Sequence, residues 1–202
     1  MSAARNVWIV AWETRCNSLV MAFIEIKKDL PFYDQSGGGV TFSGGEPLSQ
    51  PVNLLALHLE CGTLGIHRTV DTSGFALTET LMQIAEHTDL FLFDLKHMDN
   101  VQHLLYTGVA NYLILHNLQM LSKGGQQIRA RLPLTPGIND DERNIRATGS
   151  FVAKCKGVQG IDVLPYHSSA TSKYKKIGLE YKGKRFTVPS APQITRTLEV
   201  LQ

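Results

Sequence analysis

Cysteine is scarce in this 202-residue sequence. The three cysteines, Cys16, Cys61 and Cys155, lie far apart, and no two of them have the spacing of a metal-binding pair. An odd and scattered set excludes a disulfide framework and is typical of a protein of the reducing cytosol. We therefore expect a cytoplasmic protein in which each cysteine is a small buried apolar residue.

Long apolar runs and a strong charge of one sign are also missing. No stretch of about 18 apolar residues is present, so the sequence predicts no membrane span. The net charge of +2 is too small to indicate a nucleic acid or an anionic membrane as partner. The segment from Met1 to Val10 has no clear cleavage site and does not resemble a signal peptide. With 43% hydrophobic and 19% charged residues, residues 1–202 are expected to form a single packed domain.

What the sequence does contain is an alternation of short apolar runs and helical patterns. Five apolar runs are expected to be strands: Val40–Ser43, Ile66–Val70, Leu90–Asp94, Ile128–Leu134 and Ile161–Leu164. Helical patterns follow at Leu48–Gly62, Thr78–His87, Asn111–Lys123, Asp140–Lys154 and Pro192–Leu201. This alternation predicts an α/β fold with a parallel sheet covered on both faces. A doubly wound sheet and a full or partial (β/α) barrel both fit, and both carry their chemistry at the carboxyl ends of the strands.

The first predicted strand ends in a glycine pair followed by a carboxylate. Gly44, Gly45 and Glu46 come directly after Ser43. The glycines allow the backbone to approach a ligand closely, and Glu46 offers a negative charge to a cationic group. The alternative is an ordinary strand-to-helix turn that uses glycine for its backbone conformation.

Charged residues also end the next two predicted strands. Asp71 and Asp94 each follow an apolar run, and a carboxylate in that position needs a partner for its charge. The two together could hold a cation or a polar ligand, whereas each alone could simply cap the helix that follows. Lys96 adds a positive charge that suits a carboxylate or a ribose hydroxyl.

The last two predicted strands contribute cationic and imidazole groups. Arg129 and Arg131 alternate along one strand, so their side chains share a face and suit a carboxylate ligand or a structural salt bridge. His167 follows the last strand and suits a hydrogen bond to a ligand or a proton transfer, or it is a solvated loop histidine. Polar groups at five successive strand ends favour one ligand site at that edge.

These residues resemble the glycyl-radical-enzyme-activating enzymes of the radical S-adenosylmethionine (SAM) superfamily, of which pyruvate formate-lyase-activating enzyme is the best-known type. The run from Tyr33 to Leu48 is similar to their signature. Further similar runs follow in the family's order: Asp71–Gly74, Phe93–Asp99, Tyr106–Gly108, Arg131–Asp140, Leu164–His167, and Lys173-Tyr174 with Gly178. The resemblance covers about residues 28 to 180.

The resemblance implies a partial parallel (β/α) barrel that cleaves SAM reductively with a [4Fe–4S] cluster. The resulting 5′-deoxyadenosyl radical would abstract hydrogen from a glycine of a partner glycyl radical enzyme, with flavodoxin or ferredoxin as electron donor. Gly44, Gly45 and Glu46 would meet the SAM amino group. Asp71 and Asp94, with Thr72 beside them, would lie near the methionine end and form a possible monovalent cation site, Lys96 and Arg131 would face the carboxylate and ribose, and His167 the ribose or adenine.

The sequence departs from the family at its start. The family's Cys-x-x-x-Cys-x-x-Cys motif, which binds the cluster, is absent. We expect residues 1–16 to be the remnant of a ferredoxin-like insert, with the first strand and the cluster loop missing, so that the strand ending at Ser43 has an open edge. On this interpretation the chain is an N-terminally truncated enzyme and is inactive alone.

Two other hypotheses stay open at this point. One is a cluster-free paralogue that binds SAM or a protein partner without catalysis. The other, from a different enzyme class, is a barrel lyase or aldolase in which Lys96 forms a Schiff base with a carbonyl substrate.

Overall fold

A computed structural model describes residues 7–10, 19–167 and 186–201. The elements, in chain order, are β1 (Val7–Val10), α1 (Leu19–Lys28), α2 (Leu30–Ser36), β2 (Gly39–Ser43), the 3-10 helix η1 (Pro47–Ser49), α3 (Pro51–Thr63), β3 (His67–Thr72), α4 (Thr78–Ala85), β4 (Leu90–Asp94), α5 (Asn100–Thr107), α6 (Tyr112–Lys123), β5 (Ile128–Leu134), α7 (Glu142–Val152), β6 (Val158–Pro165) and α9 (Ala191–Leu201). None of these helices is long and apolar enough to span a membrane.

The strands follow one another in the sheet in the order in which they occur in the chain, from β1 to β6. β1 pairs with β2, β2 with β3, and β3 with β4, all in parallel. A doubly wound sheet would reverse its strand order at a switch point, and this sheet does not. The order therefore agrees with the predicted partial (β/α) barrel and excludes the doubly wound alternative.

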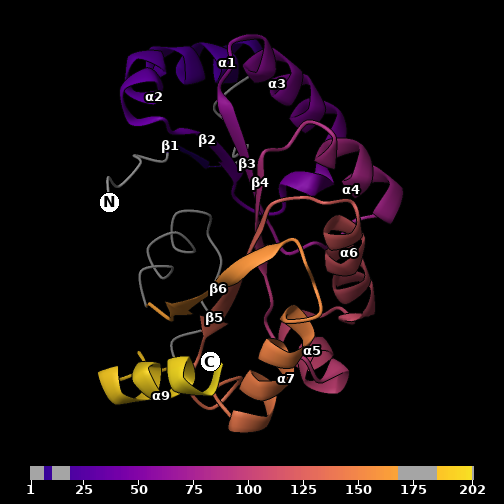
Figure 1. The fold of residues 1–202 in the computed structure, drawn as a ribbon, viewed down its shortest axis with the longest axis vertical. Helices are drawn as coiled ribbons and strands as arrows, with labels where there is room; N and C mark the ends of the chain where they lie inside the picture. The colour runs from indigo at the N-terminus through magenta and orange to yellow at the C-terminus, as the bar shows by residue number, and fades with distance from the viewer. Residues whose placement is uncertain (1–6, 11–18, 168–185, 202) are drawn as a thin grey trace, which may run out of the picture. The chain divides into compact units, whose positions relative to one another are not determined.

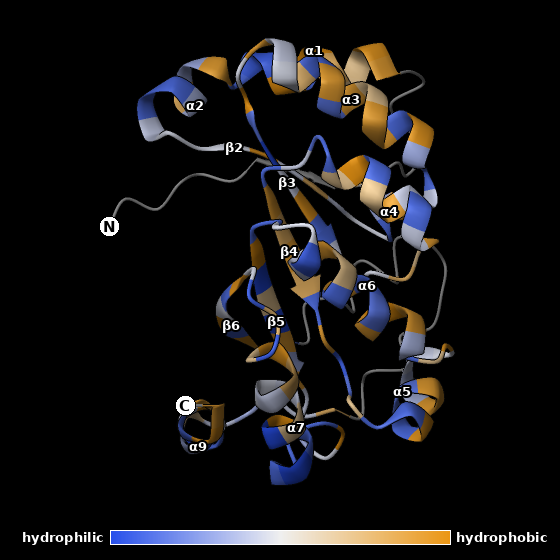
Figure 2. Cartoon of the chain, turned by 45° about the vertical axis from the view of Figure 1, so that its right-hand side comes forward, coloured by the Kyte–Doolittle hydropathy of each residue, from blue (hydrophilic) through white to orange (hydrophobic). Residues whose placement is uncertain are grey.

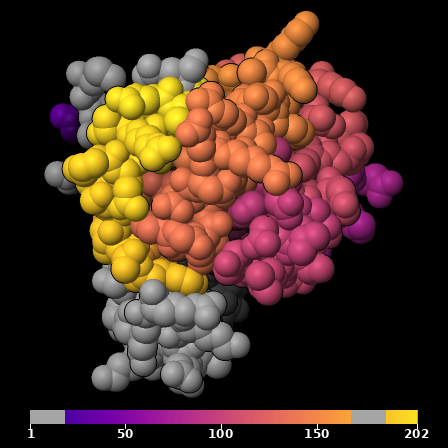
Figure 3. Space-filling model, turned by 90° about the horizontal axis from the view of Figure 1, so that it is seen from below, coloured from indigo at the N-terminus to yellow at the C-terminus, as the bar shows by residue number. Residues whose placement is uncertain are grey.

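The chain divides into two compact units. Unit 1 comprises Met1–Asp94, Tyr112–Arg129 and Cys155–Gln159, and unit 2 comprises Leu95–Asn111, Ala130–Lys154 and Gly160–Gln202. In unit 1, α1 packs on α3, α3 on α4, and α4 on α6, and Figure 1 shows these helices as a continuous row beside the strands. In unit 2, α9 packs against α7, as the neighbouring yellow and orange surfaces of Figure 3 show.

The core is formed by buried residues that alternate with less buried ones along the strands. In β4, which Figure 2 draws almost entirely in apolar colours, Phe91 and Phe93 are fully buried while Leu90 and Leu92 are half-buried. The continuous apolar run predicted that both faces are covered, and the face with Leu90 and Leu92 is the less covered of the two. β5 alternates in the same way, with Ile128, Ala130, Leu132 and Leu134 buried. Arg129 and Arg131 therefore share the other face of β5, as the sequence predicted.

All five predicted strands are present, and β4 and β5 have the predicted bounds. The prediction that no strand precedes β2 is wrong, because Val7–Val10 pairs with Val40–Ser43. Four residues of high β-propensity, Val-Trp-Ile-Val, form this strand, and the edge beside β2 is therefore paired. The rest of the predicted insert remnant, and Cys16, lie outside the described residues, as do Lys173, Tyr174 and Gly178.

Candidate functional site

The turn after β2 depends on its two glycines. Gly44 has φ 90° and Gly45 has φ 54°, backbone conformations that residues with a side chain rarely adopt. A Cβ at Gly45 would meet no atom within 4 Å, so the backbone angle, and not a lack of space, requires glycine there. The turn brings Glu46 to the N-cap of η1, with Pro47 at the first position of that short helix.

The Glu46 carboxylate is hydrogen-bonded at both oxygens. Oε1 accepts from Thr72 Oγ1 at 2.6 Å and from the Leu48 backbone N–H at 3.2 Å. Oε2 accepts from the Ser73 backbone N–H at 2.9 Å and from Ser73 Oγ at 2.6 Å. Because a carboxylate offers about four lone-pair sites, Glu46 is held as a fixed negative charge that joins the loop after β2 to the end of β3.

The residues at the end of β3 are held in place for their hydrogen bonds to Glu46. Thr72 is buried, and its hydroxyl also accepts from the Gly74 N–H at 2.9 Å. Gly74 has φ 73°, and a Cβ there would lie 2.1 Å from Phe93 Cζ, so only glycine fits. Asn117 of α6 donates to the carbonyls of Gly74 and Ala76, both at 2.8 Å. These two hydrogen bonds fix the loop that follows Ser73.

Asp71 immediately precedes Thr72, which binds Glu46. Its Oδ2 accepts from Ser43 Oγ at 3.0 Å. In the register Asp71 is opposite Leu92, so Asp94 lies two residues further along β4, on the same face as Leu92. The capping alternative fails for both carboxylates, because Leu77 is the N-cap of α4 and Asp99 is the N-cap of α5.

Six of the nine predicted site residues therefore belong to unit 1. Gly44, Gly45, Glu46, Asp71 and Thr72 lie together at the carboxyl ends of β2 and β3, with Asp94 at the end of β4. Among the described residues no group of three histidines, cysteines or carboxylates could hold a metal ion. The monovalent cation site at Asp71 and Asp94 stays a prediction.

The other three predicted residues, Lys96, Arg131 and His167, belong to unit 2. Lys96 follows β4 and lines a pocket of about 220 Å³, with Thr135, Asn139 and Phe186 among its other walls. Arg131 lies in β5, and its carbonyl accepts from the Leu95 N–H at 2.8 Å. His167 follows β6 and is exposed, so its role in a site stays a prediction.

Sequence reasoning missed the polar residues that hold these loops. Ser43 donates to Asp71 and Ser73 donates to Glu46, two of the three predicted carboxylates in unit 1. In unit 2 the buried Asn139 donates to the carbonyls of Lys96 and Pro133, both at 2.8 Å, and accepts from the Thr135 N–H at 2.8 Å. A usable signal existed for Asn117, which interrupts the apolar stripe Ile114, Leu118 and Leu121 on α6, because a buried amide needs specific partners.

All three cysteines were predicted to be small buried residues, and the two that the structure describes, Cys61 and Cys155, are buried. Burial raises the pKa of the Cys61 thiol to about 12, and it also raises the pKa of Cys155. Cys61 lies in α3 and Cys155 follows α7, so neither stands in the Cys-x-x-x-Cys-x-x-Cys spacing that binds the cluster.

Comparisons with known proteins agree with this arrangement. The family model described as "Radical SAM superfamily" matches residues 16–147. The choline trimethylamine-lyase activating enzyme of Oleidesulfovibrio alaskensis is 44% identical over 77% of this chain and 51% of its own length. The trans-4-hydroxy-L-proline dehydratase activating enzyme of Clostridioides difficile is 39% identical over 84% of this chain and 57% of its own length. The chain thus spans about half the length of these relatives.

A solved structure of an activating enzyme is also similar to this chain. The crystal structure of a domain of pyruvate-formate lyase-activating enzyme from Bacteroides vulgatus matches with a TM-score of 0.68 and 34% identity, over 81% of this chain and 92% of that one. The strand order, the glycine turn with its clamped glutamate, and these relatives lead to one conclusion. The chain belongs to the radical SAM superfamily and, within it, to the family of glycyl-radical-enzyme activating enzymes.

Proposed function

We propose that this chain forms the SAM-binding part of an oxidoreductase that activates a glycyl radical enzyme. The observation that carries the proposal is the Glu46 clamp, in which a carboxylate with four protein donors is fixed beside the Gly44-Gly45 turn. A fixed negative charge next to the half-buried Gly44 and the exposed Gly45 suits the ammonium group of an amino acid moiety. The family membership gives that amino acid its identity as SAM.

The clamp gives Glu46 two tasks. Its lone pairs are engaged within the chain, so it would attract the SAM ammonium through its charge and through the backbone that it holds in place. Asp71 and Asp94 add negative charge near the methionine end and would form the monovalent cation site. In unit 2, Lys96 and Arg131 supply the positive charge for the SAM carboxylate and the ribose, and His167 would meet the ribose or adenine.

The [4Fe–4S] cluster supplies the electron that cleaves SAM in this superfamily. Its three-cysteine motif does not occur in the 202 residues, and the buried Cys61 and Cys155 do not fit as ligands. We therefore assign no step of the reaction to this chain alone and expect it to be inactive by itself. The partner would be a glycyl radical enzyme, and the electron donor a flavodoxin or ferredoxin.

The missing cysteine motif also favours a second candidate, a paralogue that binds SAM without cleaving it. One experiment separates the two. A longer protein that carries Cys-x-x-x-Cys-x-x-Cys upstream of this chain is reconstituted anaerobically, reduced and supplied with SAM. Release of 5′-deoxyadenosine, and a glycyl radical signal by electron paramagnetic resonance when a partner is present, would support the activating enzyme. Tight SAM binding without 5′-deoxyadenosine would support the paralogue.

A further inference from the structure

Two polar atoms in the core of unit 1 have no hydrogen-bond partner among the described residues. They are the hydroxyl of Tyr33 in α2 and the Nε2 of His58 in α3, and both are shielded from solvent. Tyr33 is 4% exposed and His58 is 0% exposed. Nearly all buried polar atoms in folded proteins bind a protein group or an ordered water. These two atoms therefore need a partner from outside the chain.

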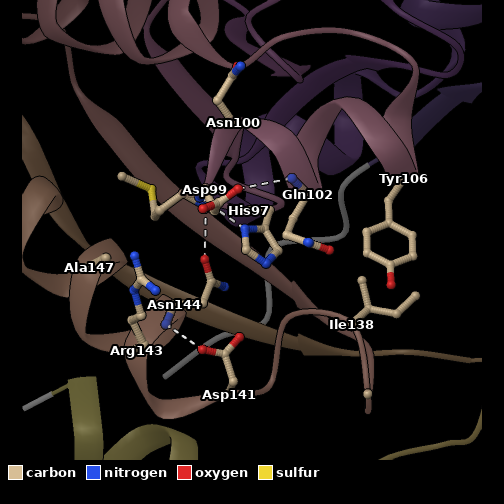
Figure 4. A pocket seen from close by; sticks show the side chains of 12 residues that line it. His97, Asp99, Asn100, Gln102, Tyr106, Ile138, Asp141, Arg143, Asn144 and Ala147 are labelled. Carbon is tan, nitrogen blue, oxygen red and sulfur yellow. Dashed lines mark hydrogen bonds between the residues drawn. The ribbon is translucent and has the colours of Figure 1, made fainter.

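A buried histidine of unit 2 shows the contrast. The Nδ1 of His97 accepts from the Asp99 N–H at 3.0 Å, and the residue borders a pocket of about 570 Å³ (Figure 4). The ring of His58 lies instead against the ring of Phe42, with 4.5 Å between the ring centres. His97 thus lies at the edge of an open space, whereas His58 is enclosed by the chain.

The two atoms without partners lie in the same part of the core. His58 and Cys61 are both buried and are three positions apart in α3, so their side chains are neighbours on one face of the helix. Burial, and then the charges of Asp29 and Cys61, raise the pKa of the Tyr33 hydroxyl to about 12. An electrostatic effect of Cys61 on Tyr33 requires the two to be close. Tyr33 therefore lies beside the turn of α3 that carries Cys61 and His58.

The two atoms are complementary in their hydrogen-bonding capacity. His58 Nδ1 lies 2.9 Å from the Leu54 carbonyl oxygen, and because a carbonyl only accepts, Nδ1 must carry the proton of the neutral ring. Nε2 is then a lone pair that accepts. The Tyr33 hydroxyl can donate and accept. The structure has no direct hydrogen bond between them, so each needs a third group.

A water molecule meets both needs at once. It can donate to Nε2 of His58 and accept from the Tyr33 hydroxyl, and a buried water typically makes two to four such bonds. A metal ion does not fit, because among the described residues no three histidines, cysteines or carboxylates are grouped to hold one. Water is the smallest neutral molecule that donates and accepts together.

We infer that a single water molecule is bound between α2 and α3, where it donates to His58 Nε2 and accepts from the Tyr33 hydroxyl. In the chain α2 precedes β2 and α3 follows it. The water thus joins the two helices that flank the strand ending at the Gly44-Gly45 turn. The inference does not rest on the proposed function.

The test is ¹⁷O relaxation dispersion of water, which counts long-lived bound waters and does not respond to exchange of the tyrosine hydroxyl proton. The full chain is compared with Tyr33→Phe, His58→Leu and the double variant, because a protein holds about one buried water per 27 residues and only the difference is informative. We expect each single variant to lose one long-lived water, since one partner does not hold a water in an apolar core. The double variant should lose the same water and no other.

A second measurement does not depend on the folding of His58→Leu. In the chain labelled with ¹⁵N-histidine, the Nε2 resonance of His58 should move downfield in Tyr33→Phe, because the unprotonated nitrogen loses its donor. Tyr112→Phe, at an exposed position of α6, is the matched control and should change neither the resonance nor the number of waters.

Three results would overturn the inference. The first is an equal number of long-lived waters in the parent and in either single variant. The second is a loss of two waters in the double variant, which would show two separate sites. The third is an Nε2 resonance that stays in place in Tyr33→Phe. A shift of this resonance without the loss of a water would show a direct hydrogen bond between Tyr33 and His58 and would also overturn it.

Discussion

The two units present their predicted ligand groups in opposite states. In unit 1 the Glu46 carboxylate already accepts hydrogen bonds from Thr72, Ser73 and Leu48. In unit 2 the side-chain nitrogen of Lys96 makes no hydrogen bond to the described residues, while Asn139 and Asn144 bind the backbone of the neighbouring loops. The carboxylate of Glu46 in unit 1 is thus held in place before any ligand binds, whereas the Lys96 side chain in unit 2 is not. Preformed charge lowers the cost of ordering a site on binding.

The largest expected effect on stability is that of a substitution at Gly74, in the loop after β3 that binds Glu46. Gly74→Ala would force a Cβ to within 2.1 Å of Phe93 Cζ at a φ of 73°, so the loop or the ring must move. We expect the free energy of unfolding to fall by about 3–4 kcal/mol from the combined overpacking and backbone strain, measured by denaturant unfolding.

The matched control for this change is Gly125→Ala. Gly125 has a similar φ of 76°, but a Cβ added there would meet no atom within 4 Å, so strain alone should cost about 1 kcal/mol. An equal loss of unfolding free energy in the two variants would show that the contact with Phe93 does not hold the loop. The loop that binds Glu46 would then not be rigid.

The next effect tests the loops of unit 2. Asn139→Ala removes three hydrogen bonds and leaves the Lys96 and Pro133 carbonyls and the Thr135 N–H without their partner. We expect a loss of about 2–3 kcal/mol and faster amide hydrogen exchange at Thr135 and its neighbours. Asn53→Ala, which removes a single exposed hydrogen bond to Gln50, should change stability by less than about 0.5 kcal/mol. Unchanged exchange at Thr135 in Asn139→Ala would contradict the assignment.

The buried His58 in the core of unit 1 is expected to make the stability of the protein depend on pH. His58 is fully buried, its Nδ1 lies 2.9 Å from the Leu54 carbonyl, and its Nε2 has no partner. Burial lowers the pKa of His58 from 6.5 to about 4. Because the folded pKa lies below the unfolded one, the stability due to neutral His58 is complete above about pH 6.5 and declines as the pH falls towards 4.

We expect the free energy of unfolding to drop by on the order of 2 kcal/mol between pH 7 and pH 4.5. His58→Leu should flatten this profile, whereas His116→Leu, at an exposed position, should leave it unchanged. Asp89, whose pKa is lowered by its hydrogen bonds to Arg68 against the opposing effect of burial, contributes mainly below this range. An unchanged slope in His58→Leu would show that another group controls it.

The sequence predicted much of the fold because its strands are short apolar runs with clear ends. β4 stops at Asp94 and β5 is followed by a Thr-Pro-Gly turn, so their bounds were found. β1 was missed because its four residues lie in a segment attributed to an insert. α5 was missed because the sequence after Lys96 was interpreted through its charges, although Asp99 is a typical N-cap residue.

The candidate site was predicted only as a set of strand-end residues. The contacts of Glu46 with Thr72 and Ser73 span 26 and 27 positions in the sequence, and they depend on how β2 and β3 are aligned. No local pattern encodes that alignment, because register is determined by pairing and packing.

A pair of calorimetric titrations tests most directly whether Glu46 binds the amino group of SAM. SAM and 5′-methylthioadenosine, which lacks the amino acid moiety, are titrated into the parent chain and into Glu46→Gln, after hydrogen exchange has shown that the turn after β2 is folded in both. We expect Glu46→Gln to weaken SAM binding about tenfold, because the negative charge that attracts the SAM ammonium is lost, and to leave 5′-methylthioadenosine binding unchanged. Equal SAM affinity in the two proteins would contradict the assignment of Glu46 to the amino group.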